Sequence, residues 1–203
     1  MTMKMTIGKW VALGVIALVL LGSWGSYNGF VSRDEAVNGA WSEVQNQLKR
    51  RSDLIPNLVG TVKGYASHEH AIFTEVAEAR AKVSQVVSLD AGKLASDPLL
   101  QRQLYAAQQG LGASLGRLIA VAEAYPQLKA DQTFLKLQDE LAGTENRIAV
   151  ARGRAIKEVQ GWNASRRRFP ASIIAGICNF LPKQYYEATA EEQKAPVVDF
   201  KTR

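Results

Sequence analysis

Apolar residues recur at steps of three and four along most of the chain, a spacing that predicts amphipathic helices rather than strands. The first stripe extends over residues 34–87 and predicts one long helix. A second helix is predicted to begin at Pro98 with Asp97 as its N-cap, because proline suits the first helical position. Asp131 is a plausible cap for a third helix that ends before Pro170.

A shorter apolar helix is predicted over residues 171–181, and the segment 88–98 is predicted to be a loop. Short connections make neighbouring helices antiparallel. The segment 33–185 is therefore predicted to be all-α, an antiparallel up-and-down four-helix bundle with three long helices and one shorter one. Residues 186–203 are polar and predict a loosely ordered tail.

Residues 10–32 contain no charged side chain and form the most apolar segment of the chain. A helix of that length spans roughly 34 Å, enough for a hydrocarbon core of about 30 Å. Residues 1–32 are therefore predicted to be a short N-terminus and a transmembrane anchor. The alternative is a cleaved signal peptide, since Ser23, Trp24 and Gly25 form a small-x-small triplet. The length of the apolar segment favours the anchor.

Basic residues near the predicted span indicate its orientation, because positively charged flanks tend to stay in the cytoplasm. Lys4 and Lys9 precede the span, whereas Arg33 alone follows it closely. This asymmetry predicts a single-pass protein with its bundle on the outer side of the membrane. The basic run at 49–51 lies at the margin of the counted flank and weakens the bias.

Pro56 stands inside an otherwise helical pattern, which is unusual. An interior proline removes one backbone hydrogen bond and crowds the preceding turn, at a cost of about 3 kcal/mol. The carbonyl that it frees, near Ser52, needs another partner. The sequence therefore predicts an architectural role for this proline and a polar group close to it.

Four polar residues are candidates for that environment. We expect Asp53 or Asn57 to pair with Asn146 or Arg147, because the first and third predicted helices run parallel in an up-and-down bundle. Such a pair would fix the helix register around Pro56, and a buried charge persists only when it is paired. The alternative is a solvent-exposed bend without a cross-helix partner.

The net charge is +6, from 25 basic and 19 acidic residues. Arg50 and Arg51 belong to one basic cluster, and residues 166–168 form another. These clusters lack the interleaved aromatic residues that stack on bases, so nucleic acid is not an expected partner. A solvated helix face is the simplest interpretation, and contact with lipid or protein is the alternative.

Candidate catalytic or metal-binding chemistry is sparse. His68 and His70 are the only histidines, and on one helix residues two apart point away from each other. Cys178 is the only cysteine and lies in an apolar run, where a buried, inert thiol is expected. No nucleophile elbow or phosphate-binding loop is present. We therefore predict no catalytic, cofactor-binding or metal site, and no enzyme.

Three strings carry a family resemblance: "AWSEVQNQLKRRSDLIPNLVGTVKGYASHE", "AYPQLKADQTFLKLQDELAGTENRIAVAR" and "FPASIIAGICNFLPKQYYEA". Together they resemble the LemA family over nearly the whole chain. The resemblance implies an N-terminal membrane segment, a four-helix bundle and a bacterial inner-membrane location, without catalytic or ligand-binding residues. Some relatives help to build magnetosome membranes, and neighbouring genes often encode membrane proteases.

The chain departs from the family pattern at two places. Ala155 and Ile156 stand where a Tyr-Asn pair is common, so the polar contact of that pair must be absent. Arg166 stands where an apolar residue is common, whereas Trp162 and Asn163 keep the second aromatic-Asn pair.

Two functions are therefore open. The first is a membrane-anchored scaffold or adaptor, held by residues 10–32, that binds a protein partner or a second copy of itself. A membrane protease or a membrane-remodelling system is the expected kind of partner. The second is a ligand-binding or enzymatic module with an unrecognised site.

Overall fold

The computed structural model describes residues 7–185, and the regular structure in that range is entirely helical, which confirms the all-α class. The predicted tail at 186–203 lies outside the described residues. In chain order the helices are α1 (Ile7–Tyr65), α2 (His70–Val87), α3 (Ala91–Ser96), α4 (Pro98–Glu123), α5 (Pro126–Lys129), α6 (Gln132–Arg167) and α7 (Ala171–Ile177).

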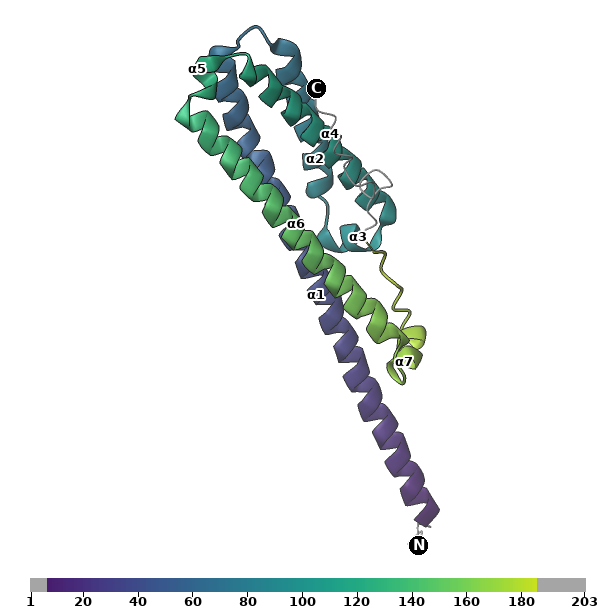
Figure 1. Ribbon diagram of the computed structural model, residues 1–203. Helices are drawn as coiled ribbons and strands as arrows, with labels where there is room; N and C mark the ends of the chain where they lie inside the picture. The colour runs from purple at the N-terminus through teal and green to yellow at the C-terminus, as the bar shows by residue number, and fades with distance from the viewer. Residues whose placement is uncertain (1–6, 186–203) are drawn as a thin grey trace, which may run out of the picture.

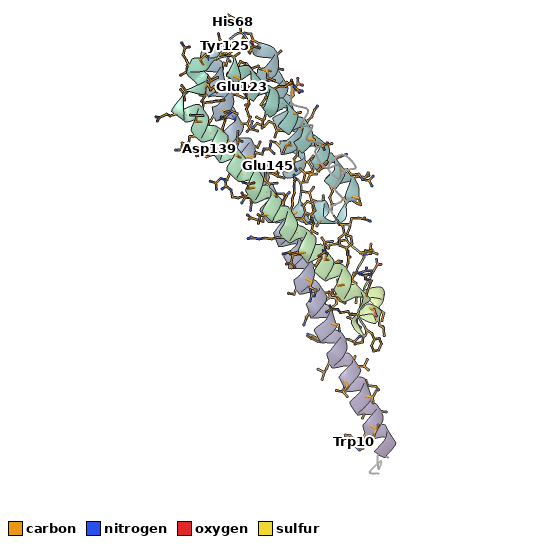
Figure 2. The ribbon with its side chains drawn as sticks, in the orientation of Figure 1. Trp10, His68, Glu123, Tyr125, Asp139 and Glu145 are labelled. Atoms are coloured by element: carbon orange, nitrogen blue, oxygen red, sulfur yellow. The ribbon has the colours of Figure 1, made fainter. Side chains whose placement is uncertain are left out.

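Helix α1 joins the apolar N-terminal segment to the rest of the molecule without a break (Figure 1). Its 59 residues correspond to about 88 Å. Near the N-terminus it is long and apolar enough to cross a membrane, and that apolar window is not buried by the rest of the chain. Burial begins at Phe30, so the apolar N-terminal segment and the first core helix are one element. Trp10 and His68 lie toward opposite ends of the molecule (Figure 2).

The chain then passes three more times along the molecule (Figure 1). Helix α2 returns along α1, α4 runs back along α2, and α6 descends along α1 toward the membrane segment. The main pairings are α1 with α6 and α2 with α4. Helices α1 and α6 are therefore antiparallel. The expectation that the first and third predicted helices run parallel is wrong, because the first predicted helix is in fact two.

The single helix predicted over residues 34–87 is interrupted between α1 and α2. A turn joins them, in which the backbone N–H of Glu69 donates to the Ala66 carbonyl at 3.1 Å. The apolar stripe continues across this turn, since Val62 ends it on one side and Ile72 resumes it on the other, both buried. Periodicity alone cannot reveal such a break, because both helices bury the same kind of face.

Buried apolar side chains form two clusters along the molecule. The distal core, farther from the membrane segment, consists of Ile55, Leu58, Val62, Ala66, Ile72, Phe73, Val76, Val83, Leu111, Leu115, Leu118, Ala122, Leu128, Phe134 and Leu137. The proximal core consists of Phe30, Val37, Trp41, Val44, Leu48, Leu94, Ala95, Leu104, Ile148, Ala151, Ala155, Val159, Trp162 and Ala175. Helices α1, α4 and α6 contribute to both clusters, and α1 and α6 pack against each other along most of the bundle.

Aspartates cap three helices. The side chain of Asp97 accepts from the N–H of Leu99 at 2.8 Å, as expected from its place before Pro98. Asp131 accepts from the N–H of Phe134 at 3.0 Å and so caps α6, also as expected. Asp90 caps α3, a short helix inside the segment that was predicted to be a loop. Leu94 and Ala95 of α3 are buried in the proximal core, which explains why this segment is ordered.

Asp131 also ties the distal end of α1 to α6. The Tyr65 hydroxyl donates to its carboxylate at 2.9 Å. Two hydrogen bonds hold the pKa of the Asp131 carboxyl below its usual value. The bond from the Phe134 N–H has the larger effect, and the bond from the Tyr65 hydroxyl comes second. The same hydrogen bond raises the pKa of Tyr65. The stabilising contact therefore needs an ionised aspartate and a neutral tyrosine, and it weakens when acid protonates Asp131.

Candidate functional site

The carbonyl left without a helical partner by Pro56 is that of Ser52, four residues earlier. The structure pairs it with Arg80 of α2, whose Nε donates to the Ser52 oxygen at 2.9 Å. Pro56 itself is exposed, and α1 continues past it without interruption. The predicted polar group near the proline therefore exists, although it comes from α2 and not from the expected residues.

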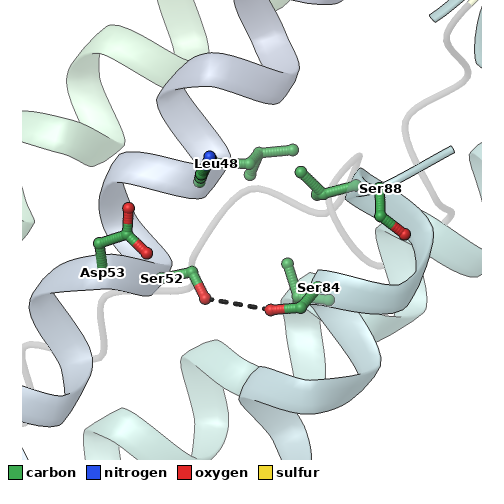
Figure 3. A pocket seen from close by; sticks show the side chains of 8 residues that line it. Leu48, Ser52, Asp53, Ser84 and Ser88 are labelled. Carbon is green, nitrogen blue, oxygen red and sulfur yellow. Dashed lines mark hydrogen bonds between the residues drawn. The ribbon is translucent and has the colours of Figure 1, made fainter. Parts of the chain in front are cut away.

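A pocket of about 300 Å³ lies between α1 and α2 beside this contact (Figure 3). We call it the serine pocket, lined by Leu48, Lys49, Ser52, Asp53, Val83, Ser84, Val87 and Ser88. The hydroxyl oxygens of Ser52 and Ser84 lie 3.3 Å apart and share one hydrogen bond. Activation of a serine needs an adjacent base, and among the described residues no hydrogen bond joins either hydroxyl to a basic or acidic side chain. Its hydroxyl pair joins two helices.

The expected pairing of Asp53 or Asn57 with Asn146 or Arg147 is not what the structure contains. All four residues are exposed, and among residues 7–185 no hydrogen bond or ion pair joins them. Because α1 and α6 are antiparallel, the side chains that meet are different from those expected for parallel helices. The alternative, a solvent-exposed bend without a cross-helix partner, is right about the exposure of Pro56 and wrong about the partner, since Arg80 of α2 binds the freed Ser52 carbonyl.

Arg51 was expected on a solvated helix face, but it connects α1 to α6 instead. Its guanidinium lies 2.6 Å from the carboxylate of Glu145, and only 14% of the Arg51 side chain is exposed. Glu145 lies in the middle part of α6 (Figure 2). Arg50, its neighbour, is exposed. The helix register at this level is therefore fixed by one residue of the basic cluster.

A shallow groove of about 580 Å³ lies between α2 and α4. We call it the outer groove, lined by Glu75, Glu78, Ala79, Lys82, Gln85, Val86, Gln103, Ala106, Ala107, Gly110, Ala113 and Arg117. Its floor on α4 consists of small residues, and charged residues surround it. An ion pair between Arg117 and Glu75 joins the two helices at one end. The groove is open, polar at its rim and large enough for side chains of another helix.

Aromatic side chains gather where α1 leaves the membrane segment. Phe30 and Trp162 meet edge to face with ring centroids 5.8 Å apart. Phe180 lies 5.0 Å from Phe30 and 5.6 Å from Trp162, and Tyr27 lies 5.7 Å from Phe180. Such pairs stabilise beyond the area they bury. This aromatic cluster, which we call the juxtamembrane lock, joins α1, α6 and the segment after α7.

Polar contacts hold the segment after α7 in the lock. The Trp162 indole donates to the Leu181 carbonyl at 2.9 Å, and the Arg166 guanidinium donates to the Phe180 carbonyl. Asn163 binds both backbone groups of Lys183, donating at 2.7 Å and accepting at 3.1 Å. The Lys183 ammonium then pairs with Asp34 of α1 at 2.8 Å. Arg166, an apparent departure from the family pattern, thus has a partner.

Two expectations about chemistry can be compared with the structure. Cys178 was expected to be buried and is exposed, because α7 turns Ala175 and not Cys178 toward the proximal core. His68 and His70 do not share one helix, since His68 lies in the turn and His70 begins α2. Within the described range, no group of three histidine, cysteine, aspartate or glutamate side chains is placed to hold a metal ion.

Comparison with known proteins now adds to this geometry. The family model described as "LemA family" matches residues 40–200. The chain is 28% identical over 174 residues to "Magnetosome protein MamQ" of Magnetospirillum gryphiswaldense, and 28% identical over 175 residues to "Magnetosome protein MamQ 2" of Paramagnetospirillum magneticum. Each match covers 79% of this chain but only 64% of the relative's length. The residues matched by the family model contain most of α1 beyond the anchor and all the later helices, and the chain belongs to the LemA family.

Proposed function

We propose that the protein is a membrane-anchored helical scaffold that presents a protein-binding face at a fixed height above the bilayer. The observation that carries this proposal is the continuity of α1 from the apolar segment into both cores. A tethered enzyme needs only a flexible linker, whereas an unbroken helix transmits position and orientation. The 33 residues from 33 to 65 extend about 50 Å beyond the anchor.

The scaffold itself would be an up-and-down four-helix bundle of α1, α2, α4 and α6. Its height favours partners that are themselves in or on the membrane. Matched relatives bear the name magnetosome protein, which supports a membrane-remodelling system as one kind of partner. A membrane protease is another, and a second copy of the chain is the third. No catalysis is part of the proposal.

The outer groove is the face that we assign to the partner. Ala106, Gly110 and Ala113 are exposed there, and small side chains let another helix approach closely. Gly110 has open space where a side chain would be, so a larger residue would fill the groove without disturbing the fold.

Photo-cross-linking in living cells tests this assignment. With p-benzoylphenylalanine in place of Ala113, we expect one discrete cross-linked product. The same group in place of Ala149, an exposed alanine on α6, should not give it. Self-association would give a product of twice 22.2 kDa. Gly110→Arg should abolish the product, because it fills the groove. Equal products from both positions, or a product insensitive to Gly110→Arg, would contradict the proposal.

We further propose that the bundle lies outside the cytoplasm of a bacterial cell, anchored in the inner membrane, following the Lys4 and Lys9 bias. A reporter that is active only outside the cytoplasm, fused after Arg203, is then expected to be active. A reporter that needs the cytoplasm should be inactive at the same position. The opposite pattern would move the bundle and its partners to the cytoplasmic side.

A further inference from the structure

Helix α7 and its flanks carry an apolar face that the rest of the described chain does not cover. Ile173 and Ile177 lie on α7, whereas Phe169 lies in the turn before it and Leu181 in the segment after it, so the helix predicted over residues 171–181 ends earlier than expected. All four side chains are exposed, Phe169 by 82% and Ile177 by 75%. The opposite face packs normally, with Ala175 buried in the proximal core. Exposed apolar side chains gathered in one short segment in this way mark a contact with a protein or a membrane.

The position of α7 indicates that a membrane, and not another protein, is the contact for this apolar surface. Helix α7 lies beside α1 at the level of the apolar segment (Figure 1). The space between them, about 480 Å³, is lined by Leu20, Ser23, Trp24, Tyr27, Asn28, Ile174 and Cys178. A hydrocarbon core of about 30 Å that begins at Trp10 reaches about 20 residues along the helix. The wall of this space on α1 therefore lies within, or at the edge of, the leaflet nearest the bundle.

The charged residues near α7 are distributed as in proteins that bind a membrane surface. The segment 169–182 contains no charged residue, whereas Arg167 and Arg168 immediately precede it and are exposed. Arg33, where α1 leaves the span, is exposed as well and lies beside Gly161 of α6. Apolar side chains would thus enter the leaflet while guanidinium groups meet its phosphates. Arginine also binds phosphate oxygens in a bidentate manner.

The juxtamembrane lock keeps this face in place. Trp162 and Arg166 hold the carbonyls of Leu181 and Phe180, so the segment after α7 is held against α6 and α1. The exposed side chains are therefore displayed at a defined depth relative to the span.

We propose that α7 and its flanks are a second membrane contact, in which the helix inserts Ile173 and Ile177, and the flanks insert Phe169 and Leu181, into the leaflet nearest the bundle. Arg167 and Arg168 bind the phosphates of anionic lipids beside it. The protein thus holds the bilayer at two places, the span of α1 and the surface helix α7, which together fix its tilt. The proposal rests on the membrane anchoring of α1, which the experiment below tests separately.

Collision measurements on a spin label test the insertion. The full chain with Cys178→Ser and Ile177→Cys is labelled and placed, one copy per disc, in nanodiscs of phosphatidylethanolamine and phosphatidylglycerol. We expect the label to collide more with oxygen than with a water-soluble nickel chelate. A label at position 21, from Leu21→Cys, should behave likewise and reports the span alone. A label at exposed Lys63, from Lys63→Cys, should show the opposite preference.

Three results would overturn the proposal while the label at position 21 remains in lipid. A label at position 177 that matches the Lys63 label would place α7 in water. A label shielded from both reagents would place it against protein. A label that becomes shielded only when two copies share a disc would make this face a self-association surface.

Arginine variants test whether Arg167 and Arg168 bind anionic lipids. Arg167→Gln with Arg168→Gln should shift the label at position 177 toward water in the anionic discs, and should have a smaller effect in phosphatidylcholine discs, whose headgroups carry a phosphate but no net charge. Arg50→Gln with Arg102→Gln is the matched control, since both arginines are exposed elsewhere on the chain. Equal behaviour of the two double variants in anionic discs would show that these arginines do not bind lipid phosphate.

Discussion

Replacing Trp162 with alanine is expected to lower the free energy of unfolding by about 3–5 kcal/mol, the range typical of a buried aromatic residue. Trp162 is only 2% exposed and contacts Phe30 and Phe180 edge to face. Its loss would leave a cavity between α1 and α6 and remove the donor to the Leu181 carbonyl. Urea unfolding of the full chain in detergent micelles, followed by circular dichroism, measures the change.

Two variants separate the causes of that loss. Trp162→Phe keeps an aromatic ring but removes the indole N–H, so it should cost only about 0.5–1.5 kcal/mol if the hydrogen bond is the main part lost. Leu135→Ala, an exposed position on the same helix, should change stability by less than about 0.5 kcal/mol. If Trp162→Ala were as mild as Leu135→Ala, the juxtamembrane lock would not hold the proximal end of the fold.

The second large effect concerns the proline in α1. Removing the Arg80 donor is expected to cost about 1–3 kcal/mol, because the buried Ser52 carbonyl then has no partner. Arg80→Met is the suitable variant, since it keeps an aliphatic stem and removes the Nε donor. In a Pro56→Ala background the alanine supplies a backbone N–H to the same carbonyl. The cost of Arg80→Met should then fall to less than about 0.5 kcal/mol.

The two substitutions should therefore couple by about 0.5–3 kcal/mol in a double-mutant cycle, as residues that share one partner do. Lys82→Ala, an exposed change on the same helix, should have little effect in either background. Strict additivity of Arg80→Met and Pro56→Ala would mean that Arg80 does not replace the hydrogen bond lost at the proline. Pro56 would then need another explanation.

Helix content and the capped starts of α4 and α6 were predictable because they depend on local chemistry. The caps at Asp97 and Asp131 and the proline at the first turn of α4 are correct. Stripe residues such as Val44 and Leu48 are buried, as the three-four spacing requires. An aspartate before a helix acts on its nearest N–H groups, so few alternatives compete with it.

Pairing between helices was not predictable, because it depends on the turn between α1 and α2. Because that turn was not predicted, α6 was expected to run parallel to α1, whereas the two helices are antiparallel. The partners expected on α6 were therefore Asn146 and Arg147, whereas the observed ion pair joins Arg51 to Glu145, the residue before Asn146. The Arg80 contact was hidden for the same reason, since Arg80 was placed on the same continuous helix as Ser52. The residue types near Pro56 gave no indication of the contact between Arg80 and the Ser52 carbonyl.

Ala155 and Ile156, where the chain departs from the family pattern, lie close to Trp41. All three residues border a space of about 10 Å³. The indole Nε1 of Trp41 is buried and has no hydrogen-bond partner among the described residues. The polar contact of the family's Tyr-Asn pair was expected to be absent here. A buried donor without a hydrogen-bond partner is consistent with that absence.

The continuity of α1 is the central claim, and a distance between two spin labels tests it most directly. Labels replace Leu18 in the span and Lys49 in the bundle, both exposed, in a Cys178→Ser chain held in nanodiscs. One unbroken helix predicts a single narrow distribution near about 47 Å, from 31 residues at 1.5 Å each. A flexible Gly-Ser insert after Ser32 should broaden it. A distribution equally broad or shifted to shorter distances without the insert would show that the anchor and the bundle are joined by a hinge, and would contradict the scaffold proposal.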